Sequence, residues 1–490
     1  MTEAYDIAII GGGVNGAGIA RDAAGRGAQV LLLEARDLAS GTSSASTKLV
    51  HGGLRYLEYY EFGLVREALG EREVLWRIAP HIVRPMRFVL PHDSRQRPRW
   101  MLRAGLWLYD HIGGRRTLPG AKAIRLDRHV AGEALGADYT HGFEYSDGWV
   151  DDARLVVLNA VDARERGADI RTHCRMTSAR REGGLWRIEA GGESFHARAL
   201  VNAAGPGADD VDRLAGLVPA RGLRRVRGSH IVVPKLFDHD YAYLLQQPDT
   251  RIVFAIPYED DFTLIGTTDA DHSGSLEDVH IGEDETDYLL AAANRSFRRA
   301  LGRGDIAWTY AGVRALVDDG SGRPEAATRG YELPLSQPED GAPVLSVYGG
   351  KITSYRHLAE AAVDALAARL PALEGARWTA KTALPGGEFD PSEQAEFIAG
   401  LNARYPFLSA ADAVRIARAY GTRAEWWLED AQDWNDLGRN FGAGLTEAEI
   451  AYLQEAEWAR SAEDVLWRRS KLGLHLSEAE REAVSSFLKD

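Results

Sequence analysis

The feature that most constrains this chain is a glycine-rich turn close to its N-terminus. An apolar run rich in β-formers covers Tyr5 to Ile10, and a helical pattern follows from about Asn15 to Arg26. Gly11, Gly13 and Gly16 form the pattern G-x-G-x-x-G at the junction of the two. Glycines at this spacing permit a tight turn and let backbone amides approach a pyrophosphate, which the helix N-terminus then faces. The turn therefore predicts a dinucleotide-binding site.

A second apolar run, Gln29 to Glu34, completes a strand, helix and strand unit. Parallel strands joined by a helix need helices on the faces of their sheet, so we expect the chain to begin as an α/β layer structure. Glu34 ends this second run, where a carboxylate accepts hydrogen bonds from a ribose hydroxyl and repels a 2′-phosphate. The strands, the spacing and the acid together favour a dinucleotide without a 2′-phosphate.

Size and composition exclude several classes of protein. The 490 residues suffice for two or three domains, and 45% hydrophobic with 27% charged residues is typical of a soluble globular chain. The sequence has no apolar run of about 20 residues, and its N-terminus lacks the charged segment and cleavage site of a secretory signal. The single cysteine, Cys174, excludes an intrachain disulfide and any site built from several thiolates. We therefore expect a reducing, cytoplasmic location and no metal site.

The periodicity of the chain predicts three domains. Helical patterns cover Phe62 to Arg77 and Val150 to Arg166, whereas the middle of the chain alternates short β-like runs with turns and indicates a mixed sheet. Only helical periodicity remains after Pro391, beyond a linker at Pro385 to Gly387. We expect a discontinuous dinucleotide domain (1–75, 148–220 and 340–384), a substrate domain (76–147 and 221–339) and a helical C-terminal domain (385–490).

Two later loops favour FAD over NAD. Val201 to Pro206 is a strand that ends in small residues, among them Gly205, and Leu345 to Val347 leads into the glycine turn of Gly349 to Thr353. A nicotinamide enzyme often completes its cofactor domain in one continuous stretch, whereas three separated loops suit the longer FAD. The alternative is that the two later loops are ordinary strand-to-helix turns.

Seven short motifs follow one another along nearly the whole chain: Thr42–Lys48, His51–Glu58, Glu144–Asp147 with Trp149–Leu155, Gly228–Pro234, Gly266–Asp269, Gly349–Thr353, and a helical tail with Trp458 and Asp464–Arg469. Their number and order make the set specific, although each motif is short. In these motifs the chain resembles the FAD-dependent glycerol-3-phosphate dehydrogenase family.

The resemblance implies a FAD-binding, Rossmann-like domain of the glycine-oxidase and D-amino-acid-oxidase type, a mixed-sheet substrate domain and a helical C-terminal domain, an α/β (α+β) fold. It also implies the aerobic, respiratory activity: sn-glycerol 3-phosphate is oxidised to dihydroxyacetone phosphate by hydride transfer to FAD, and electrons pass to ubiquinone or menaquinone. The anaerobic relative carries further cysteine chemistry in its C-terminal part, and the related oxidase typically has an insertion in the substrate domain. Neither variant is favoured here.

We expect the cofactor to be held by residues of the glycine turn, of the small polar loop that follows, and of the two later loops. These candidates are Gly11, Gly13, Asn15, Gly16, Glu34, Thr42, Ser43, Ser46, Thr47, Lys48, Gly52, Gly205, Gly350, Lys351, Ile352 and Thr353. Ser46, Thr47 and Lys48 are expected to face the FAD diphosphate, although such a loop is also a common connector.

Oxidation of an alcohol beside a phosphate requires a hydride acceptor, a base and cations for the phosphate. Arg55, Arg314 and Arg329 are the candidates for the phosphate, because guanidinium groups bind phosphate oxygens bidentately and stay charged. The resemblance points to the same three arginines. The family usually has a proline where this chain has Ala315, so we expect a softer turn beside Arg314.

His230 is the candidate general base, because an imidazole exchanges a proton near neutral pH. The alternative is a structural histidine, with Lys351 polarising the substrate oxygen or stabilising negative charge on the flavin. Tyr56 and Thr353 are candidates for hydroxyl contacts to the substrate.

The segment from Arg72 to Arg116 combines ten arginines with three acidic residues and several tryptophans and leucines. Amphipathic segments of this kind bind anionic interfaces without spanning them. Since a quinone is lipid-soluble, we expect this segment to contact an anionic membrane surface, at the cytoplasmic face of the inner membrane. The alternative is an ordinary solvated face over a packed core.

Two other functions remain open from the residues alone. An amino-acid or amine oxidase would use the same fold with oxygen as acceptor, and a flavin-containing nucleic-acid-binding protein would use the same arginine segment on phosphates. The net charge of −14 argues against nucleic acid as a partner. The oligomeric state is not determined by the sequence, and a homodimer is one option.

Overall fold

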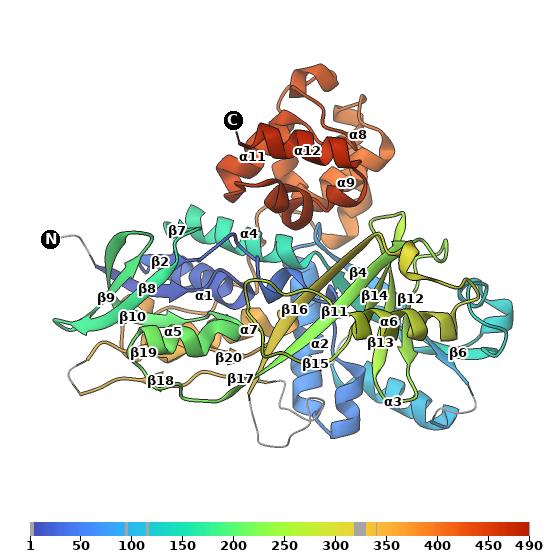
Figure 1. Cartoon of the computed structure of the whole chain (residues 1–490), viewed down its shortest axis with the longest axis horizontal. Coiled ribbons are helices and arrows are strands. Elements are labelled where there is room, and N and C mark those ends of the chain that lie inside the picture. The colour runs from blue at the N-terminus through green and yellow to red at the C-terminus, as the bar shows by residue number, and fades with distance from the viewer. Residues whose placement is uncertain (1–3, 94–96, 114–116, 318–329, 340, 490) are drawn as a thin grey trace.

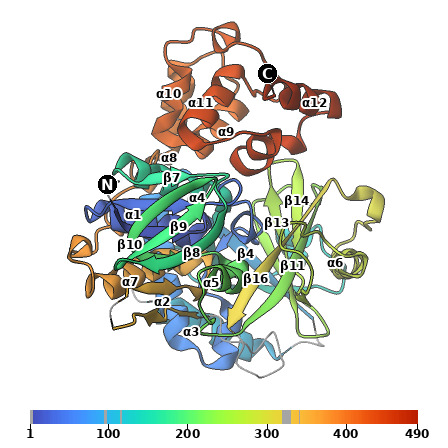
Figure 2. The same cartoon turned by 60° about the vertical axis from the view of Figure 1, so that its left-hand side comes forward.

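The computed structural model describes residues 4–93, 97–113, 117–317, 330–339 and 341–489. Two β-sheets lie side by side, and a helical C-terminal domain sits on one side of the pair (Figure 1). Figure 2, turned by 60°, shows the C-terminal domain again on that side, with helices α2 (Phe62–Ile78) and α3 (Arg99–Ile112) at the opposite end of the molecule. The described residues therefore form two large sheets and a helical C-terminal domain.

Most strands of the first sheet fall in the segments expected for the dinucleotide domain. Its central strands run parallel in the order β19, β10, β1, β2 and β7, which confirms the α/β layer predicted from the N-terminal unit. The strands are β1 (Tyr5–Ile10), β2 (Val30–Leu33), β7 (Asp169–Arg171), β8 (Met176–Glu182), β9 (Leu185–Ala190), β10 (Glu193–Asn202), β18 (Leu335–Ser336) and β19 (Val344–Ser346).

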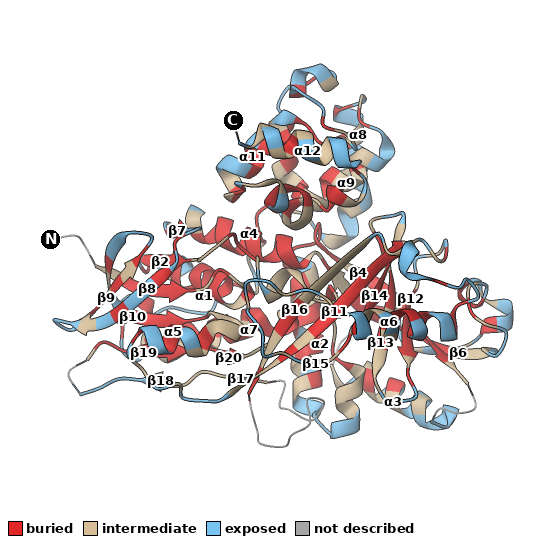
Figure 3. Cartoon of the chain, in the orientation of Figure 1, coloured by how far each residue is buried: buried red, intermediate tan, exposed pale blue. Residues whose placement is uncertain are grey.

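Side-chain alternation along β1 determines how this sheet is covered. Ile7 and Ile9 pack against helices α1 (Val14–Gly25), α4 (Asp152–Glu165) and α7 (Tyr355–Ala367) on one face. Ala8 and Ile10 pack on the other face with β8, β9 and helix α5 (Ala208–Leu214). Both faces are buried (Figure 3), so the central strands are apolar throughout, as parallel strands require.

The second sheet is mixed, as predicted for the substrate domain. Only β4 and β12 pair in parallel among its described neighbours. Its strands are β3 (Leu49–Val50), β4 (Val83–His92), β5 (Lys122–Arg125), β6 (His141–Val150), β11 (Leu223–Pro234), β12 (Ala242–Gln246), β13 (Ile252–Tyr258), β14 (Phe262–Gly266), β15 (Ala270–Asp271) and β16 (Trp308–Val317). Helix α6 (Glu283–Ser296) covers one face, and α2 and α3 cover the other.

The C-terminal domain is helical, as expected from the periodicity beyond Pro391. Its helices are α8 (Gln394–Arg404), α9 (Ala410–Tyr420), α10 (Glu425–Leu428), α11 (Glu447–Glu457) and α12 (Glu478–Phe487). They surround one apolar core that includes Tyr420, Leu453 and Leu466. No described helix of the chain is long and apolar enough to cross a membrane.

The structure corrects several sequence-based details. Leu335–Ser336 pairs with β19 in the first sheet, although the expected boundary placed it in the substrate domain. Leu49–Val50 pairs with β6 in the second sheet, although it falls within the expected dinucleotide segment. Ala315 lies inside strand β16 and pairs with Arg225, so the softer turn expected beside Arg314 is wrong.

Candidate active site

The glycine turn after β1 packs directly against Ala203, the residue that follows the neighbouring strand β10. Gly11 has φ +113°, and a side chain there would approach the carbonyl oxygen of Ala203 to 2.6 Å. A side chain at Gly16 would collide with the carbonyl oxygen of Gly11, and Gly13 is the N-cap of α1. Only glycine fits such contacts, so the turn leaves the helix N-terminus with its amides accessible to an anion.

Glu34 lies at the end of β2, beside the glycine turn. Its Oε2 accepts a hydrogen bond from the amide of Gly12 at 2.6 Å, and its Oε1 accepts one from the amide of Arg36 at 2.8 Å. These bonds fix the carboxylate at the edge of the turn, where the sequence pattern expects the ribose.

The small polar loop after β2 lies between α1 and the second sheet. Ser43 Oγ accepts a hydrogen bond from the amide of Val14 at 3.0 Å, and Thr42 Oγ1 donates to the carbonyl oxygen of Val313 at 2.5 Å. The loop therefore connects the glycine turn to strand β16.

Asp152 holds the second half of this loop from the start of α4. The carboxylate accepts from Ser46 Oγ at 2.7 Å and from Lys48 Nζ at 2.6 Å. Lys48 is fully buried, and its ammonium group also donates to the carbonyl oxygen of Ser44 at 3.1 Å. The side chains of Ser46 and Lys48 are thus used within the loop, which leaves backbone atoms as their means of contact with a cofactor.

The two later loops meet the glycine turn at one edge of the first sheet. Ile10 lies opposite Asn202 and Asn202 opposite Ser346 in parallel register, so all three strands end at the same level. The switch points of parallel sheets at this edge are where nucleotides bind. Gly205, with φ +57°, follows β10 directly.

Asn15 joins the first of these loops to the last. Its Nδ2 lies 3.4 Å from the carbonyl oxygen of Gly349, and its buried Oδ1 has no hydrogen-bond donor among the described residues. A side chain at Gly350, which has φ +93°, would meet Asn15 and Leu358. Ile352 packs against the core of the first sheet and starts the short helix Ile352–Ser354.

His230 is buried on strand β11, facing the polar loop. Its Nε2 lies 3.0 Å from Thr47 Oγ1, and its ring stacks on Tyr310 with the ring centres 4.7 Å apart. Its Nδ1 is buried without a partner among the described residues. Burial, and then the positive charges of Arg314 and Lys48, lower the pKa of His230 well below its usual value. The imidazole is therefore neutral at physiological pH.

Arg314 extends from strand β16 toward the same place. Its guanidinium forms an ion pair with Asp269, and Nη2 donates to Thr267 Oγ1 at 3.0 Å. A side chain at Gly228, on the neighbouring strand β11, would collide with the guanidinium. Asp269 and Thr267 therefore hold the guanidinium of Arg314 in one orientation. Its side chain is still 28% exposed.

The loop with Arg55 and Tyr56 lies against the last glycine turn. The amide of His51 donates to Thr353 Oγ1 at 3.2 Å, and Lys351 Nζ lies 3.8 Å from the centre of the Tyr56 ring. Arg55 makes no ion pair with another described residue. These contacts place Tyr56 beside Lys351 and the start of the loop beside Thr353, and Arg55 immediately precedes Tyr56 in the chain.

Arg329 lies outside the described residues. The residue that follows it, Gly330, accepts a hydrogen bond from the amide of Gly350 at 3.1 Å. The described part of that segment therefore lies beside the last glycine turn.

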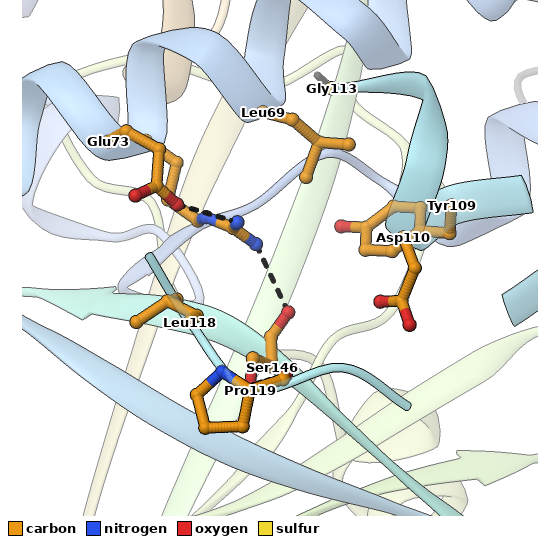
Figure 4. Close-up of a pocket in the computed structure, with 9 residues that line it drawn as sticks. Leu69, Glu73, Tyr109, Asp110, Gly113, Leu118, Pro119 and Ser146 are labelled. Carbon is orange, nitrogen blue, oxygen red and sulfur yellow. Dashed lines mark hydrogen bonds and ion pairs between the residues drawn. The ribbon is translucent and has the colours of Figure 1, made fainter. Parts of the chain in front are cut away.

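Helix α3 anchors the other end of this loop. The amide of Gly52 donates to Tyr109 Oη at 2.8 Å, and Tyr109 Oη donates to Asp147 at 2.8 Å. Figure 4 shows Tyr109 across a cavity of about 20 Å³ from Glu73 and Leu69 of α2. Burial raises the pKa of Asp147 to about 6, against the lowering effect of Arg72.

Four residues that the sequence analysis did not assign complete the site: Asp152, Thr267, Asp269 and Tyr310. The available signals were two of the motifs: Trp149–Leu155, which contains Asp152, and Gly266–Asp269, which contains both partners of Arg314. Nothing in the local sequence pairs residues 45 positions apart, and the pairing follows only from the order of strands in the second sheet.

The glycine turns at the ends of the parallel strands form a binding site for a nucleotide. A buried neutral histidine, His230, and an arginine held by two partners, Arg314, lie beside it. This combination is typical of an enzyme that uses a dinucleotide cofactor. Residues 6–356 match the family model described as FAD dependent oxidoreductase, and residues 377–489 match the C-terminal domain of alpha-glycerophosphate oxidase. The chain belongs to the FAD-dependent oxidoreductase family. This confirms the family inferred from the motifs.

Relatives of known function match along the whole length. The chain is 52% identical to the D-erythritol 1-phosphate dehydrogenase of Brucella abortus (98% of this chain, 97% of the relative). It is 50% identical to the aerobic glycerol-3-phosphate dehydrogenase of Escherichia coli (99% and 97%). The two relatives are named for different substrates, although their sequence identity to this chain is nearly the same.

Solved structures show the same fold. A Bacillus halodurans glycerol-3-phosphate dehydrogenase complexed with FAD has TM-score 0.78 at 26% identity, covering 100% of this chain and 94% of that one. A glycine oxidase from Geobacillus kaustophilus has TM-score 0.54 at 20% identity, covering 78% and 99%. The glycine-oxidase type of fold expected from the motifs is confirmed.

The described residues fit FAD, the cofactor of the family. Three loops from separate parts of the chain form one extended cradle, in which glycines leave backbone amides accessible and Asn15 Oδ1 has no described donor. Within the described part of the chain, no cluster of three or more His, Cys, Asp or Glu side chains has the geometry of a metal site.

Proposed function

We propose that the chain oxidises sn-glycerol 3-phosphate to dihydroxyacetone phosphate and passes the electrons to a membrane quinone, ubiquinone or menaquinone. The observation that carries this proposal is the guanidinium of Arg314, whose charge acts on the buried His230. Lys351, packed on Tyr56 in the last glycine turn, and Arg55 of the neighbouring loop are the further cations of the proposed site. A set of this charge suits a small phosphate dianion. The full-length relationship to the Escherichia coli enzyme supports the substrate.

In this proposal the arginines bind the phosphate, Lys351 polarises the substrate oxygen or stabilises negative charge on the flavin, and Tyr56 and Thr353 contact the substrate through their hydroxyls. FAD, when bound, supplies the hydride acceptor. The secondary alcohol loses a hydride from carbon and a proton from oxygen, and neutral His230 takes the proton at Nδ1. Burial first, and then nearby positive charge, lower the pKa of His230, and a bound dianion offsets the second of these causes and so makes the imidazole more basic.

A four-carbon substrate is the second candidate, since the Brucella abortus relative is named for D-erythritol 1-phosphate. The cation set binds the phosphate of either molecule, so the phosphate does not distinguish them. Discrimination depends on the room for a longer polyol chain.

The decisive experiment is anaerobic titration of the purified yellow protein with each phosphate, following the flavin absorbance. Glycerol 3-phosphate is expected to bleach the flavin at lower concentration than D-erythritol 1-phosphate. Bleaching by the four-carbon substrate alone would replace the proposal with the second candidate, and bleaching by neither would refute both.

Single-turnover mixing tests His230. His230→Gln is expected to reduce flavin with glycerol 3-phosphate at least about a hundredfold more slowly, the usual range for loss of a positioned base. A rate equal to that of the unchanged protein would transfer the role to Lys351.

The expected membrane contact is also part of this proposal. Some arginines of the basic segment form ion pairs with buried carboxylates instead of facing solvent: Arg72 pairs with Asp147 and Arg87 with Glu144. Helix α3 supports the contact best, because Trp100 and Trp107 are 70% and 60% exposed on it. Two exposed indoles beside exposed arginines, Arg99 and Arg103, suit an anionic lipid surface at the cytoplasmic face of the inner membrane.

A further inference from the structure

A buried carboxylate, Glu285, lies behind the second sheet, on the face opposite to the site. It occupies the first turn of α6 and is 7% exposed. Since side chains alternate along β11, Arg227 and Ser229 point toward α6, whereas His230 points toward the site. The contacts agree: Arg227 and Ser229 bond to Glu285, and His230 stacks on Tyr310.

Both oxygens of Glu285 are fully used. Oε1 accepts from Ser229 Oγ at 2.9 Å and from Thr268 Oγ1 at 2.5 Å. Oε2 accepts from the amide of Gly282 at 3.0 Å and pairs with Arg227 at 2.6 Å. Burial opposes ionisation, but these bonds outweigh it and lower the pKa of Glu285. The carboxylate is therefore charged at neutral pH.

The two hydroxyls that bond to Glu285 adjoin the two main groups of the site. Ser229 immediately precedes His230. Thr268 stands between Thr267 and Asp269, the two residues that bond to the guanidinium of Arg314. In addition, the amide of Ser229 donates to Thr268 Oγ1 at 2.9 Å, so the two segments are joined to each other as well.

We propose that Glu285 is a positioning residue for the reaction, which fixes His230 and the partners of Arg314 by bonding through Ser229 and Thr268 from behind the sheet. The proposal rests on the proposed function, because it concerns the same site. Glu285 itself contacts neither the substrate nor the reacting atoms.

The test is Glu285→Gln in the FAD-loaded, full-length protein. The amide keeps the size of the side chain, but its nitrogen accepts no hydrogen bond, so at least two of the four bonds are lost. We expect the KM for glycerol 3-phosphate to rise and kcat to fall, each about tenfold, since each lost hydrogen bond to a charged group typically has an effect of at least this size. The bound FAD content should stay the same.

Two further variants test the two contacts of Glu285 separately, the one with Ser229 and the one with Thr268. Ser229→Ala should lower kcat more than it raises KM, because it releases the segment of His230. Thr268→Val should raise KM more than it lowers kcat, because it releases the partners of Arg314. Combined with Glu285→Gln, each should have less effect than the product of the single changes, since the bonds are already broken.

Leu289→Ala is the matched control for a merely structural role. Leu289 lies one turn further along α6, is fully buried and packs in the core beneath the sheet. This variant should lower the melting temperature at least as much as Glu285→Gln while leaving KM and kcat close to those of the unchanged protein.

The proposal is overturned if Glu285→Gln leaves both kinetic constants unchanged, if Leu289→Ala changes them equally, or if the combined variants are strictly multiplicative. A different result would refute the proposed function instead: unchanged protein whose flavin is not bleached by glycerol 3-phosphate. The two failures are therefore distinguishable in the same set of assays.

Discussion

Arg314 illustrates how one residue depends on its neighbours. An ion pair with Asp269 and a bond to Thr267 hold its planar guanidinium, whose fork also matches a phosphate. Arg314→Lys replaces the fork by a single ammonium group and should raise the KM for glycerol 3-phosphate about ten- to a hundredfold. Steady-state kinetics with a dye acceptor measure this, and the flavin absorbance should show undiminished FAD.

Arg303→Lys is the control for Arg314. Arg303 makes an exposed ion pair with Asp287 on the far side of the second sheet, so its replacement should leave the KM unchanged. An unchanged KM in Arg314→Lys as well would remove Arg314 from the phosphate site.

Single residues were predictable where a local pattern determines them. The spacing of Gly11 and Gly16 and the acid at Glu34 follow from the chemistry of one turn, and all three lie together at the end of the strands. Asp152 and Asp269 were not predictable as partners, because each pairs with a residue far away in the sequence: Asp152 with Lys48, 104 positions earlier, and Asp269 with Arg314, 45 positions later. Lys48 is a further example. The sequence analysis expected it to face the FAD diphosphate, whereas in the structure its buried ammonium group donates to Asp152.

At the level of elements, the apolar run Tyr5 to Ile10 predicted β1 residue for residue, and the helical patterns predicted α2 and α4 within two residues of their bounds. Strand β10 is longer than predicted and begins at Glu193, since its polar half is stabilised by pairing with β9. Helix α3 was not predicted as a helix. Its arginines and tryptophans indicated a surface, and only the structure shows Leu106 and Tyr109 buried on its other side.

The membrane contact is tested on α3. Trp100→Ser combined with Trp107→Ser removes the exposed indoles while keeping the buried face, and should weaken binding to anionic phospholipid vesicles at least about tenfold. Flotation of the protein with such vesicles measures the binding. Charge reversal of Arg97 and Arg99 to glutamate should have the same effect and depend on salt.

Trp426→Ser provides the control for α3. Trp426 is a tryptophan of similar exposure, 56%, in helix α10 of the C-terminal domain, and Figure 2 shows α10 at the opposite end of the molecule from α3. If this variant loses vesicle binding and the α3 variants do not, the contact lies elsewhere.

At the scale of the whole molecule, buried ion pairs join the C-terminal domain to the first sheet. Arg154 of α4 and Glu457 of α11 form a bidentate pair with almost no exposure, and Arg469 pairs with Asp37 at 2.7 Å. The contact between the C-terminal domain and the first sheet therefore contains buried charged side chains, and each of them needs an oppositely charged partner.

Arg154→Ala should destabilise the protein by about 3–5 kcal/mol, because it leaves the Glu457 carboxylate buried without its main partner. Denaturant unfolding measures this loss. Arg404→Ala, in the exposed pair with Glu425, should cost less than about 1 kcal/mol. Equal losses in the two variants would contradict the assignment of stability to the buried pair.

His81 makes stability depend on pH at the same junction. Burial, and then the charge of Arg154, lower the pKa of His81 to about 3, against a contact with the backbone of Pro385 that raises it. The unfolded chain binds this proton near pH 6.5 and the folded chain does not, so stability is lost as the pH falls below 6.5, by up to about 1.4 kcal/mol per pH unit.

His81→Asn should make this loss shallower between pH 6.5 and 4.5 in denaturant unfolding. Part of the slope should remain, because the pKa of His230 is lowered as well. His280→Asn, at an exposed position, should keep the full slope, and an unchanged slope in His81→Asn would show that other groups dominate.

The cradle for FAD has a consequence for the biosynthesis of the protein. Its walls come from the ends of β1, β10 and β19, so its last wall is supplied by Gly349 and Gly350, after more than two thirds of the chain. A nascent chain still attached to the ribosome before that point has the first glycine turn but no opposite wall. We therefore expect the flavin to be acquired late in translation or after release, and chains truncated before Gly349 to be purified without colour.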